Sequence, residues 1–178
     1  MQLWIDSLDS PIGTICLVTN EEAILAVDFE DCRDRMMTLL GARFDDISLV
    51  PMANPLGVTV KLQRYLDGQL DALEAIAVDP GGTPFQQEVW AALTTIPSGT
   101  AISYGELAKK LHKPGASRAV GLANSKNPIA IVIPCHRVIG ANGQLTGYAG
   151  GVDRKRWLLT HEGAECVTSS MQQMALPL

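Results

Sequence analysis

The sequence predicts an α/β protein of two domains: an N-terminal antiparallel sheet with helices in residues 1–80, and a mainly helical domain with a helix-turn-helix in residues 81–165. Short apolar runs bounded by turn residues fill the first part of the chain, whereas helix-start signals fill the second. Asp79-Pro80-Gly81-Gly82, which breaks any regular element, separates the two parts. The charge balance also changes sign near this segment, which supports a domain boundary there.

The N-terminal part of the chain predicts three strands and two helices. Three apolar runs, Leu3–Ser7, Gly13–Thr19 and Ala23–Phe29, are separated by short turn segments, a spacing typical of an antiparallel meander. Apolar residues then recur at helical spacing in Cys32–Leu40 and Val58–Leu66, and a glycine closely follows each segment. We therefore expect a meander sheet with two amphipathic helices.

Two capping boxes mark helix starts in the second part. Thr83-Pro84-Phe85-Gln86 opens a helix that Pro97 stops, and Ser103-Tyr104-Gly105-Glu106 opens a shorter one. After the turn at Lys113-Pro114-Gly115, the segment Ser117–Asn124 predicts another short helix. The last two helices, joined by this tight turn, are a candidate helix-turn-helix.

Three further segments complete the pattern. Ile129–Pro134 is a continuous apolar run and predicts a buried strand or extended segment. Asp153–His161 predicts a last helix, with Gly163 past its end. Residues 166–178 are polar without a period and predict a disordered tail.

Composition restricts the class of protein. The 178 residues are 47% hydrophobic and 19% charged, which predicts a packed core. No stretch approaches the roughly 18 consecutive apolar residues of a membrane span, and Met1–Asp6 lacks the basic region and apolar run of a secretory leader. Cysteines at positions 16, 32, 135 and 166 are scattered without a CxxC pair, which favours a reducing compartment. We expect a cytoplasmic protein.

The net charge of −5 conceals an uneven distribution. Residues 1–96 hold five Lys and Arg against fifteen Asp and Glu, whereas residues 97–178 hold nine against four. All nine cations of the second part lie between Pro97 and His161, where the only acidic residues are Glu106 and Asp153. This asymmetry indicates either a half that faces a polyanion or two solvated faces of opposite sign, and charge alone does not choose between them.

Cys135 is the candidate reactive residue, within Ile133-Pro134-Cys135-His136-Arg137-Val138. A cysteine reacts as its thiolate, and a nearby base lowers the cost of forming that anion. His136 is adjacent, and Glu162 near the end of the last helix is placed to orient an imidazole. The alternative is a small core cysteine that ends an apolar strand. The proline before Cys135 and the polar residues after it favour a cleft, but from these residues alone both interpretations stay open.

Pro134-Cys135-His136-Arg137-Val138 resembles the active-site signature of the O6-alkylguanine-DNA alkyltransferases. The segment 127–138, the Gly147–Gly151 loop and Leu158–Gly163 occur in that family's order and spacing. Further matches lie at 82–86, Val89-Trp90, 103–105 and 118–121. The resemblance covers about residues 82–163, whereas residues 1–80 are similar in layout only. It implies a ribonuclease H-like fold for the N-terminal domain and irreversible transfer of an alkyl group to the protein.

The resemblance implies catalytic roles for five residues. Cys135 would be the nucleophile, His136 its base through a bridging water, and Glu162 the residue that holds and charge-balances His136. Asn127 would brace the turn that carries the cysteine. Tyr104 would donate a proton toward the guanine ring as the base leaves. The implied substrates are O6-alkylguanine and O4-alkylthymine in DNA.

The resemblance also implies a substrate pocket. The carbonyls of Cys135 and Val138 would meet the guanine amino group, the Ala149 N–H would meet O6, and Tyr148 would wall the alkyl group. Ala149 and Ala130 stand where some relatives carry serine and proline, which suggests a pocket roomier than methyl requires. No cofactor or metal is implied. Some relatives bind zinc in the N-terminal domain, but here all the histidines lie in the second half.

Double-stranded DNA is the implied partner, bound in the minor groove by a protein that is monomeric in solution. Small side chains in the 117–124 helix permit close approach but offer few donors, so sequence preference should be slight. Arg118 would fill the gap left by a flipped nucleotide. The DNA-binding residues are then Tyr104, Ser117, Arg118, Ala119, Gly121 and Ala123.

Three other functions compete with this interpretation. A non-catalytic sensor of alkylated guanine is disfavoured because such relatives usually replace the nucleophile by tryptophan. A cysteine hydrolase using Cys135 and His136 is disfavoured because neighbours on an extended chain point opposite ways. A helix-turn-helix regulator is disfavoured by the small side chains of the 117–124 helix.

Overall fold

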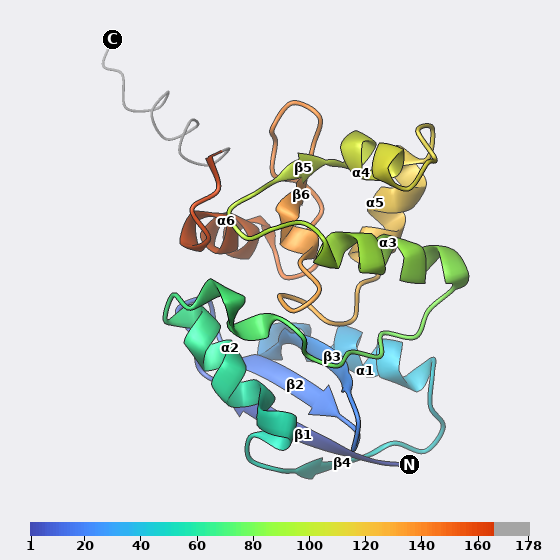
Figure 1. Ribbon diagram of the computed structural model, residues 1–178. Coiled ribbons are helices and arrows are strands. Elements are labelled where there is room, and N and C mark those ends of the chain that lie inside the picture. The colour runs from blue at the N-terminus through green and yellow to red at the C-terminus, as the bar shows by residue number, and fades with distance from the viewer. Residues whose placement is uncertain (166–178) are drawn as a thin grey trace.

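The first strands of the chain form a sheet in the order β3-β2-β1-β4. β1 (Gln2–Leu8), β2 (Ile15–Thr19) and β3 (Ile24–Phe29) pair antiparallel, as their spacing predicts, and β4 (Ser48–Pro51) pairs with β1 in parallel. The computed structural model describes residues 1–165, so the tail predicted for residues 166–178 lies outside the described residues. Figure 1 shows the sheet domain on one side and the helical domain on the other.

β4 is a strand that the sequence analysis missed. It has four residues and no alternation of buried and exposed positions. Its register pairs Leu49 with Leu3, a separation far beyond that of a hairpin, so no local turn signal announces it. β4 lies at the edge of the sheet, where Pro51 is tolerated because an edge strand has amides without a partner strand. The sheet is therefore mixed and not purely antiparallel.

Both faces of the sheet are covered, which explains why β2 is buried along its whole length. Side chains of β2 alternate, so that Leu17 belongs to the main core and Val18 to a smaller core on the opposite face. Helix α1 (Arg33–Gly41) packs on the smaller core, and helix α2 (Val58–Leu66) packs on the main one. The main core continues into the second half of the chain.

The second half is mainly helical. Both predicted capping boxes are formed, by Thr83 with Gln86 and by Ser103 with Glu106. α5 packs against α3 and α4. None of the helices in residues 1–165 has the length and apolar character needed to cross a membrane. The elements are α3 (Pro84–Thr94), α4 (Tyr104–Lys110), α5 (Ser117–Ser125), α6 (Val152–His161) and the parallel pair β5 (Ile102–Ser103) and β6 (Val138–Ile139).

Short 3-10 turns link these elements. One of them, η4 (Cys135–Arg137), carries the candidate nucleophile. The others are η1 (Glu30–Cys32), η2 (Pro55–Gly57) and η3 (Leu70–Leu73).

The strand predicted for Ile129–Pro134 is not formed as a regular strand. Ile129 makes a single parallel bridge to Val27 of β3, and the Ala130 amide donates to the Val27 carbonyl at 2.9 Å. Ile131 then turns the chain with a φ of 71°. A left-handed backbone costs an L-residue about 1–2 kcal/mol, so the surrounding contacts must hold it in place. The apolar run is therefore a strained turn that ties the helical domain to the sheet.

Candidate active site

Cys135 opens the η4 turn, which two buried asparagines hold. The Asn127 side chain donates to the Ile133 carbonyl at 2.8 Å and accepts from the Ile129 amide at 3.0 Å. The Asn124 side chain donates to the Cys135 carbonyl at 3.3 Å. These bonds fix the chain before the cysteine and at the cysteine itself. Because η4 is a turn, the assumption of an extended chain at Cys135 and His136 was wrong.

The Cys135 thiol is buried, with 6% of the residue exposed. Burial raises the pKa of the thiol above its ordinary range, and the Asn127 side chain and the charges of Lys155 and Arg35 oppose that rise without cancelling it. The thiol is therefore protonated at neutral pH. It needs a proton acceptor when it reacts, because the thiolate is the nucleophile.

His136 is completely buried, and its Nε2 lies 2.8 Å from Oε1 of Glu162, the C-cap residue of α6. Burial lowers the pKa of His136, Glu162 opposes this, and Arg137 adds to the lowering. Because Arg137 already compensates the Glu162 carboxylate, the imidazole is neutral at neutral pH and can accept a proton. Its other nitrogen, Nδ1, is buried without a hydrogen-bond partner among residues 1–165.

Besides His136, Glu162 accepts hydrogen bonds from two other side chains. The Tyr65 hydroxyl donates to its Oε1 at 2.7 Å, and Arg137 donates through Nε to Oε2 and through Nη2 to Oε1, each at 2.9 Å. Burial alone would raise the pKa of Glu162, but the bonds from His136 and Arg137 hold it well below its usual range. The carboxylate is therefore charged and fully compensated in the protein interior.

Sequence reasoning missed Tyr65 and Arg137 as parts of this network. Tyr65 lies 97 residues before Glu162 and looked only like a core residue of α2. The one available signal was its hydroxyl, which needs a partner when a tyrosine is buried. In the sequence, Arg137 was one of the nine cations between Pro97 and His161, for which a solvated or DNA-facing surface was expected. Instead it is buried and also binds the Ile96 carbonyl and the Ser98 hydroxyl.

Two tyrosines lie near the thiol. Burial raises the pKa of both hydroxyls, and the nearby Cys135 raises it further. Tyr104 begins α4 and donates to the Thr146 carbonyl at 3.3 Å, whereas the Tyr148 hydroxyl is buried without a partner among the described residues. Val138, buried at the start of β6, directly follows the cysteine turn. The structure thus gathers both predicted tyrosines around Cys135.

The two alanines of the predicted pocket have different environments. Ala149 is exposed in the loop before α6, and its carbonyl lies 3.8 Å from Cys32 Sγ. Ala130 is buried in the turn against β3. Because the Ala130 amide binds the Val27 carbonyl at 2.9 Å, a proline at position 130 would remove that bond as well as narrow the pocket.

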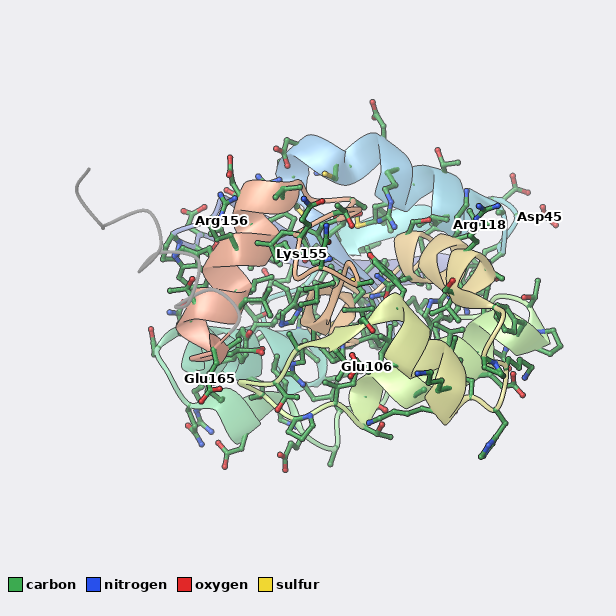
Figure 2. All side chains as sticks on the ribbon, turned by 90° about the horizontal axis from the view of Figure 1, so that it is seen from above. Asp45, Glu106, Arg118, Lys155, Arg156 and Glu165 are labelled. Atoms are coloured by element: carbon green, nitrogen blue, oxygen red, sulfur yellow. The ribbon has the colours of Figure 1, made fainter. Side chains whose placement is uncertain are left out.

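Helix α5 presents a different face from the one predicted. Arg118 and Ala119 are exposed, and Ser117 and Gly121 are half-buried. Ala123 is buried, and its carbonyl accepts the Trp90 indole N–H at 2.9 Å, so its place on the outer face was wrong. Helical spacing puts Leu122, which is 63% exposed, on that face instead. Figure 2 shows Arg118 at the outer end of α5.

Three of the nine cations between Pro97 and His161 are not on an open surface. Arg137 binds Glu162, and Arg154 of α6 binds Asp31 of the N-terminal domain. Lys155 is buried and donates to the Thr146 carbonyl at 2.8 Å. In Figure 2 Lys155 points into the molecule, whereas Arg156 lies on the outer side of the same helix. The basic surface of this half is correspondingly smaller than its sequence indicates.

Two family models together match most of the chain. Residues 5–80 match the ribonuclease-like domain of 6-O-methylguanine DNA methyltransferase, and residues 84–164 match its DNA binding domain. Cys135, His136 and Glu162 all fall within the second match.

Known proteins resemble the chain along nearly its whole length. It is 57% identical over 161 residues to the methylated-DNA–protein-cysteine methyltransferase of Mycobacterium bovis, covering 88% of this chain and 90% of that one. It is 49% identical over 166 residues to the protein of that name from Salmonella typhimurium, covering 92% and 97%. The crystal structure of Mycobacterium tuberculosis OGT in complex with DNA superposes with a TM-score of 0.78 at 42% identity, covering 92% and 93%. The chain therefore belongs to the 6-O-methylguanine DNA methyltransferase family.

Proposed function

We propose that this protein repairs DNA by moving an alkyl group from O6-alkylguanine, and from O4-alkylthymine, onto Cys135. The observation that carries the proposal is the arrangement of the cysteine turn. A buried, protonated thiol is followed by a neutral imidazole that a charged carboxylate holds at 2.8 Å. The names of the relatives support the same chemistry.

The proton of the Cys135 thiol would leave through His136. Its Nδ1 is the imidazole nitrogen that Glu162 does not engage, and we assign it to accept the proton through a bridging water. The resulting imidazolium would be stabilised by the carboxylate on the opposite side of the ring. Sulfur then attacks the saturated carbon, a C–S bond forms, and the C–O bond breaks with its electron pair going to the base.

Proton balance requires a donor to the departing base. Tyr104 keeps its hydroxyl proton at neutral pH because burial raises its pKa, and we assign it to hydrogen-bond the guanine ring as charge develops there. Over the whole reaction the thiol proton replaces the alkyl group on the base, and the alkyl group replaces the proton on sulfur. The product is a stable thioether, so the protein is consumed after one turnover.

The base would be recognised mainly by backbone groups. The Cys135 carbonyl accepts one hydrogen bond from Asn124 and retains a second lone pair, which we assign to the guanine amino group together with the Val138 carbonyl. The Ala149 N–H would meet O6, Tyr148 would wall the alkyl group, and Ala130 would border it. Asn127 would keep the turn in shape, as its two bonds within the 129–133 segment indicate.

We further propose that α4 and α5 act as a helix-turn-helix that enters the minor groove of DNA. The outer face of α5 carries Arg118 and Ala119, with Ser117 and Gly121 half-buried beside them. Small side chains allow a close approach with little sequence preference. The alkylated atom is stacked inside the duplex, so the base must be flipped, and Arg118 would take its place. One copy of the chain carries all the groups that these steps use.

The nucleophile is tested by transfer of a radiolabelled methyl group from an O6-methylguanine duplex to the protein. We expect Cys135→Ser to lose transfer while it still binds DNA. The matched control, Cys32→Ser, removes another thiol and should retain transfer. A cysteine hydrolase or a DNA-binding regulator would label neither protein. Transfer to Cys135→Ser at the wild-type rate would refute the assignment.

A further inference from the structure

Arg154 connects the loop before α6 to the sheet domain through contacts in several directions. Its Nη1 and Nη2 bind the two carboxylate oxygens of Asp31, each at 2.9 Å. Its Nε donates to the Ile12 carbonyl at 2.8 Å, and its Nη1 also donates to the Gly150 carbonyl at 3.1 Å. The guanidinium carbon lies 4.0 Å from the centre of the Phe29 ring. A planar fork of donors is the only side chain that can make these contacts at once.

The sheet domain is shaped to receive this guanidinium. Gly13 has a φ of 109°, and a Cβ there would lie 2.9 Å from Arg154 Nη2, so both backbone conformation and space call for glycine. Asp31 is held in its charged form because hydrogen bonds from Arg154 lower its pKa. Arg154 itself is mostly buried, with 19% of its side chain exposed. The contacts are thus more than a chance surface ion pair.

The loop that Arg154 holds is the one that carries Tyr148 and Ala149. Its ends are glycines with positive φ, 65° at Gly147 and 93° at Gly151, and such residues absorb backbone rotation easily. Between these ends, a Cβ at Gly150 would lie 2.8 Å from Phe29 and 2.9 Å from the Tyr148 ring. Gly150 is therefore packed between an aromatic ring of the sheet domain and one of the pocket, while its carbonyl binds Arg154.

We propose that Arg154 is a positioning residue: by clamping the 147–151 loop onto Asp31 and Phe29, it keeps the pocket for the alkylated base assembled. The clamp rests on the proposed function, because it acts through Tyr148 and the Ala149 N–H of that site. Without these contacts the 147–151 loop would populate other conformations, and the alkylated base would bind only those molecules in which the pocket is assembled. The apparent dissociation constant then rises as that fraction falls, whereas the rate constant of the bound complex stays the same.

The test uses the full chain and the free base O6-benzylguanine, which needs neither DNA nor flipping. Formation of the benzyl adduct on Cys135 is followed against benzylguanine concentration, giving a half-saturating concentration and a limiting rate constant. If Arg154→Ala lowers the assembled fraction to about a tenth, the half-saturating concentration rises about tenfold at an unchanged limiting rate constant. Arg154→Lys should show most of this rise, because one ammonium cannot replace the fork.

Arg156→Ala is the matched control. Arg156 lies on the same helix and makes an exposed ion pair with Asp153 at 3.0 Å, so its loss should leave both constants at their wild-type values. Asp31→Asn keeps the shape of the clamp and removes one charge. It should raise the half-saturating concentration by a smaller factor than Arg154→Ala, and with Arg154→Lys it decides the matter if Arg154→Ala does not fold.

Two results would overturn the clamp. Wild-type constants in the Arg154 and Asp31 variants would show that the loop needs no anchor. A fall in the limiting rate constant at an unchanged half-saturating concentration would show that Arg154 affects the reaction step or the amount of folded protein, and not the assembly of the pocket. Failure of the wild-type protein to form any adduct on Cys135 would instead refute the proposed function, and the clamp with it.

Discussion

Glu162 is the residue through which individual side chains of both domains meet. His136 and Arg137 reach it from the cysteine turn, and Tyr65 reaches it from α2 of the sheet domain. Moving a carboxylate out of water costs several kcal/mol unless donors replace the lost solvent. Each donor therefore stabilises the fold and also keeps the carboxylate charged beside His136.

Tyr65→Phe tests this network. The change removes only the hydroxyl that donates to Glu162 at 2.7 Å and leaves the buried ring in place. Because hydrogen bonds to charged groups contribute about 1.5–3 kcal/mol, we expect the free energy of unfolding in urea to fall by about that amount. Tyr104→Phe, which loses a longer bond to a neutral carbonyl, should lose less. Equal losses of unfolding free energy in the two variants would contradict a stronger hydrogen bond from Tyr65 to the charged Glu162.

The pH dependence of adduct formation with O6-benzylguanine tests the role of His136. A base must be neutral to accept a proton, and burial lowers the pKa of His136 below its ordinary value of 6.5. The rate constant should therefore be level above pH 6.5 and fall only at lower pH, as the imidazole becomes protonated. A preformed thiolate predicts a different profile. Because burial raises the pKa of the Cys135 thiol, the thiolate fraction, and with it the rate constant, would climb about tenfold per pH unit through pH 8.

Folding stability has to be followed alongside the rate at mildly acid pH. Burial lowers the pKa of His136, so the unfolded protein binds that proton more tightly and stability falls as the pH drops below about 6.5, the ordinary value of the imidazole. The pKa of Glu162 is lower in the folded protein than its ordinary value of 4.5, because the hydrogen bonds from His136 and Arg137 outweigh burial. Its contribution to stability is thus complete above 4.5 and is lost only as the pH falls through the lowered folded value. Circular dichroism at each pH provides the control. A midpoint for the rate at or above 6.5 would contradict the assignment of His136 as a buried neutral base.

At the scale of elements, the structure explains which helices and strands the sequence could predict. The helices that begin at Pro84 and Tyr104 carry capping boxes, so their starts are encoded within four residues. The apolar run at Ile129–Pro134 has the composition of a strand, yet tertiary contacts bend it at Ile131. Local periodicity cannot report a bond to β3 from a hundred residues away.

Helix α5 gives a prediction at this scale. If its start fills the gap left by a flipped base, Arg118→Ala should slow repair of duplex DNA by about tenfold to a hundredfold, because unstacking a base costs a few kcal/mol. Reaction with O6-benzylguanine should be unchanged. Lys126→Ala, which removes an exposed charge just after the other end of the helix, is the control. Equal losses of rate on both substrates would show that Arg118 supports the fold or the reactivity of Cys135 instead.

For the whole molecule, the exposed charges set how strongly DNA binding depends on salt. Of the nine cations between Pro97 and His161, only six are exposed: Lys109, Lys110, Lys113, Arg118, Lys126 and Arg156. Each neutralised phosphate contributes about −0.9 to the slope of log affinity against log salt, so we expect a slope no steeper than about −5. Fluorescence anisotropy with an undamaged duplex measures it. A slope near −8, or none at all, would contradict this reduced surface.

The candidate site was predictable only where its residues are close in sequence or match a family signature. Cys135 and His136 are neighbours, and Glu162 follows a helix with a recognisable end. Tyr65, Arg154 and Asp31 entered no prediction of the site, because their contacts arise where two domains meet. The charge asymmetry was real in the sequence, but it overstated the basic surface, since folding takes Arg137, Arg154 and Lys155 off the exposed surface.

The central claim is that Cys135 itself receives the alkyl group. Mass spectrometry of the intact protein, mixed with an excess of an O6-methylguanine duplex, should show the mass of one methyl group added and no second addition on longer incubation. Digestion and fragmentation should then locate that group on Cys135, leaving Cys16 and Cys32 unmodified. An unmodified protein beside demethylated DNA, or a methyl group on a different residue, would contradict the account.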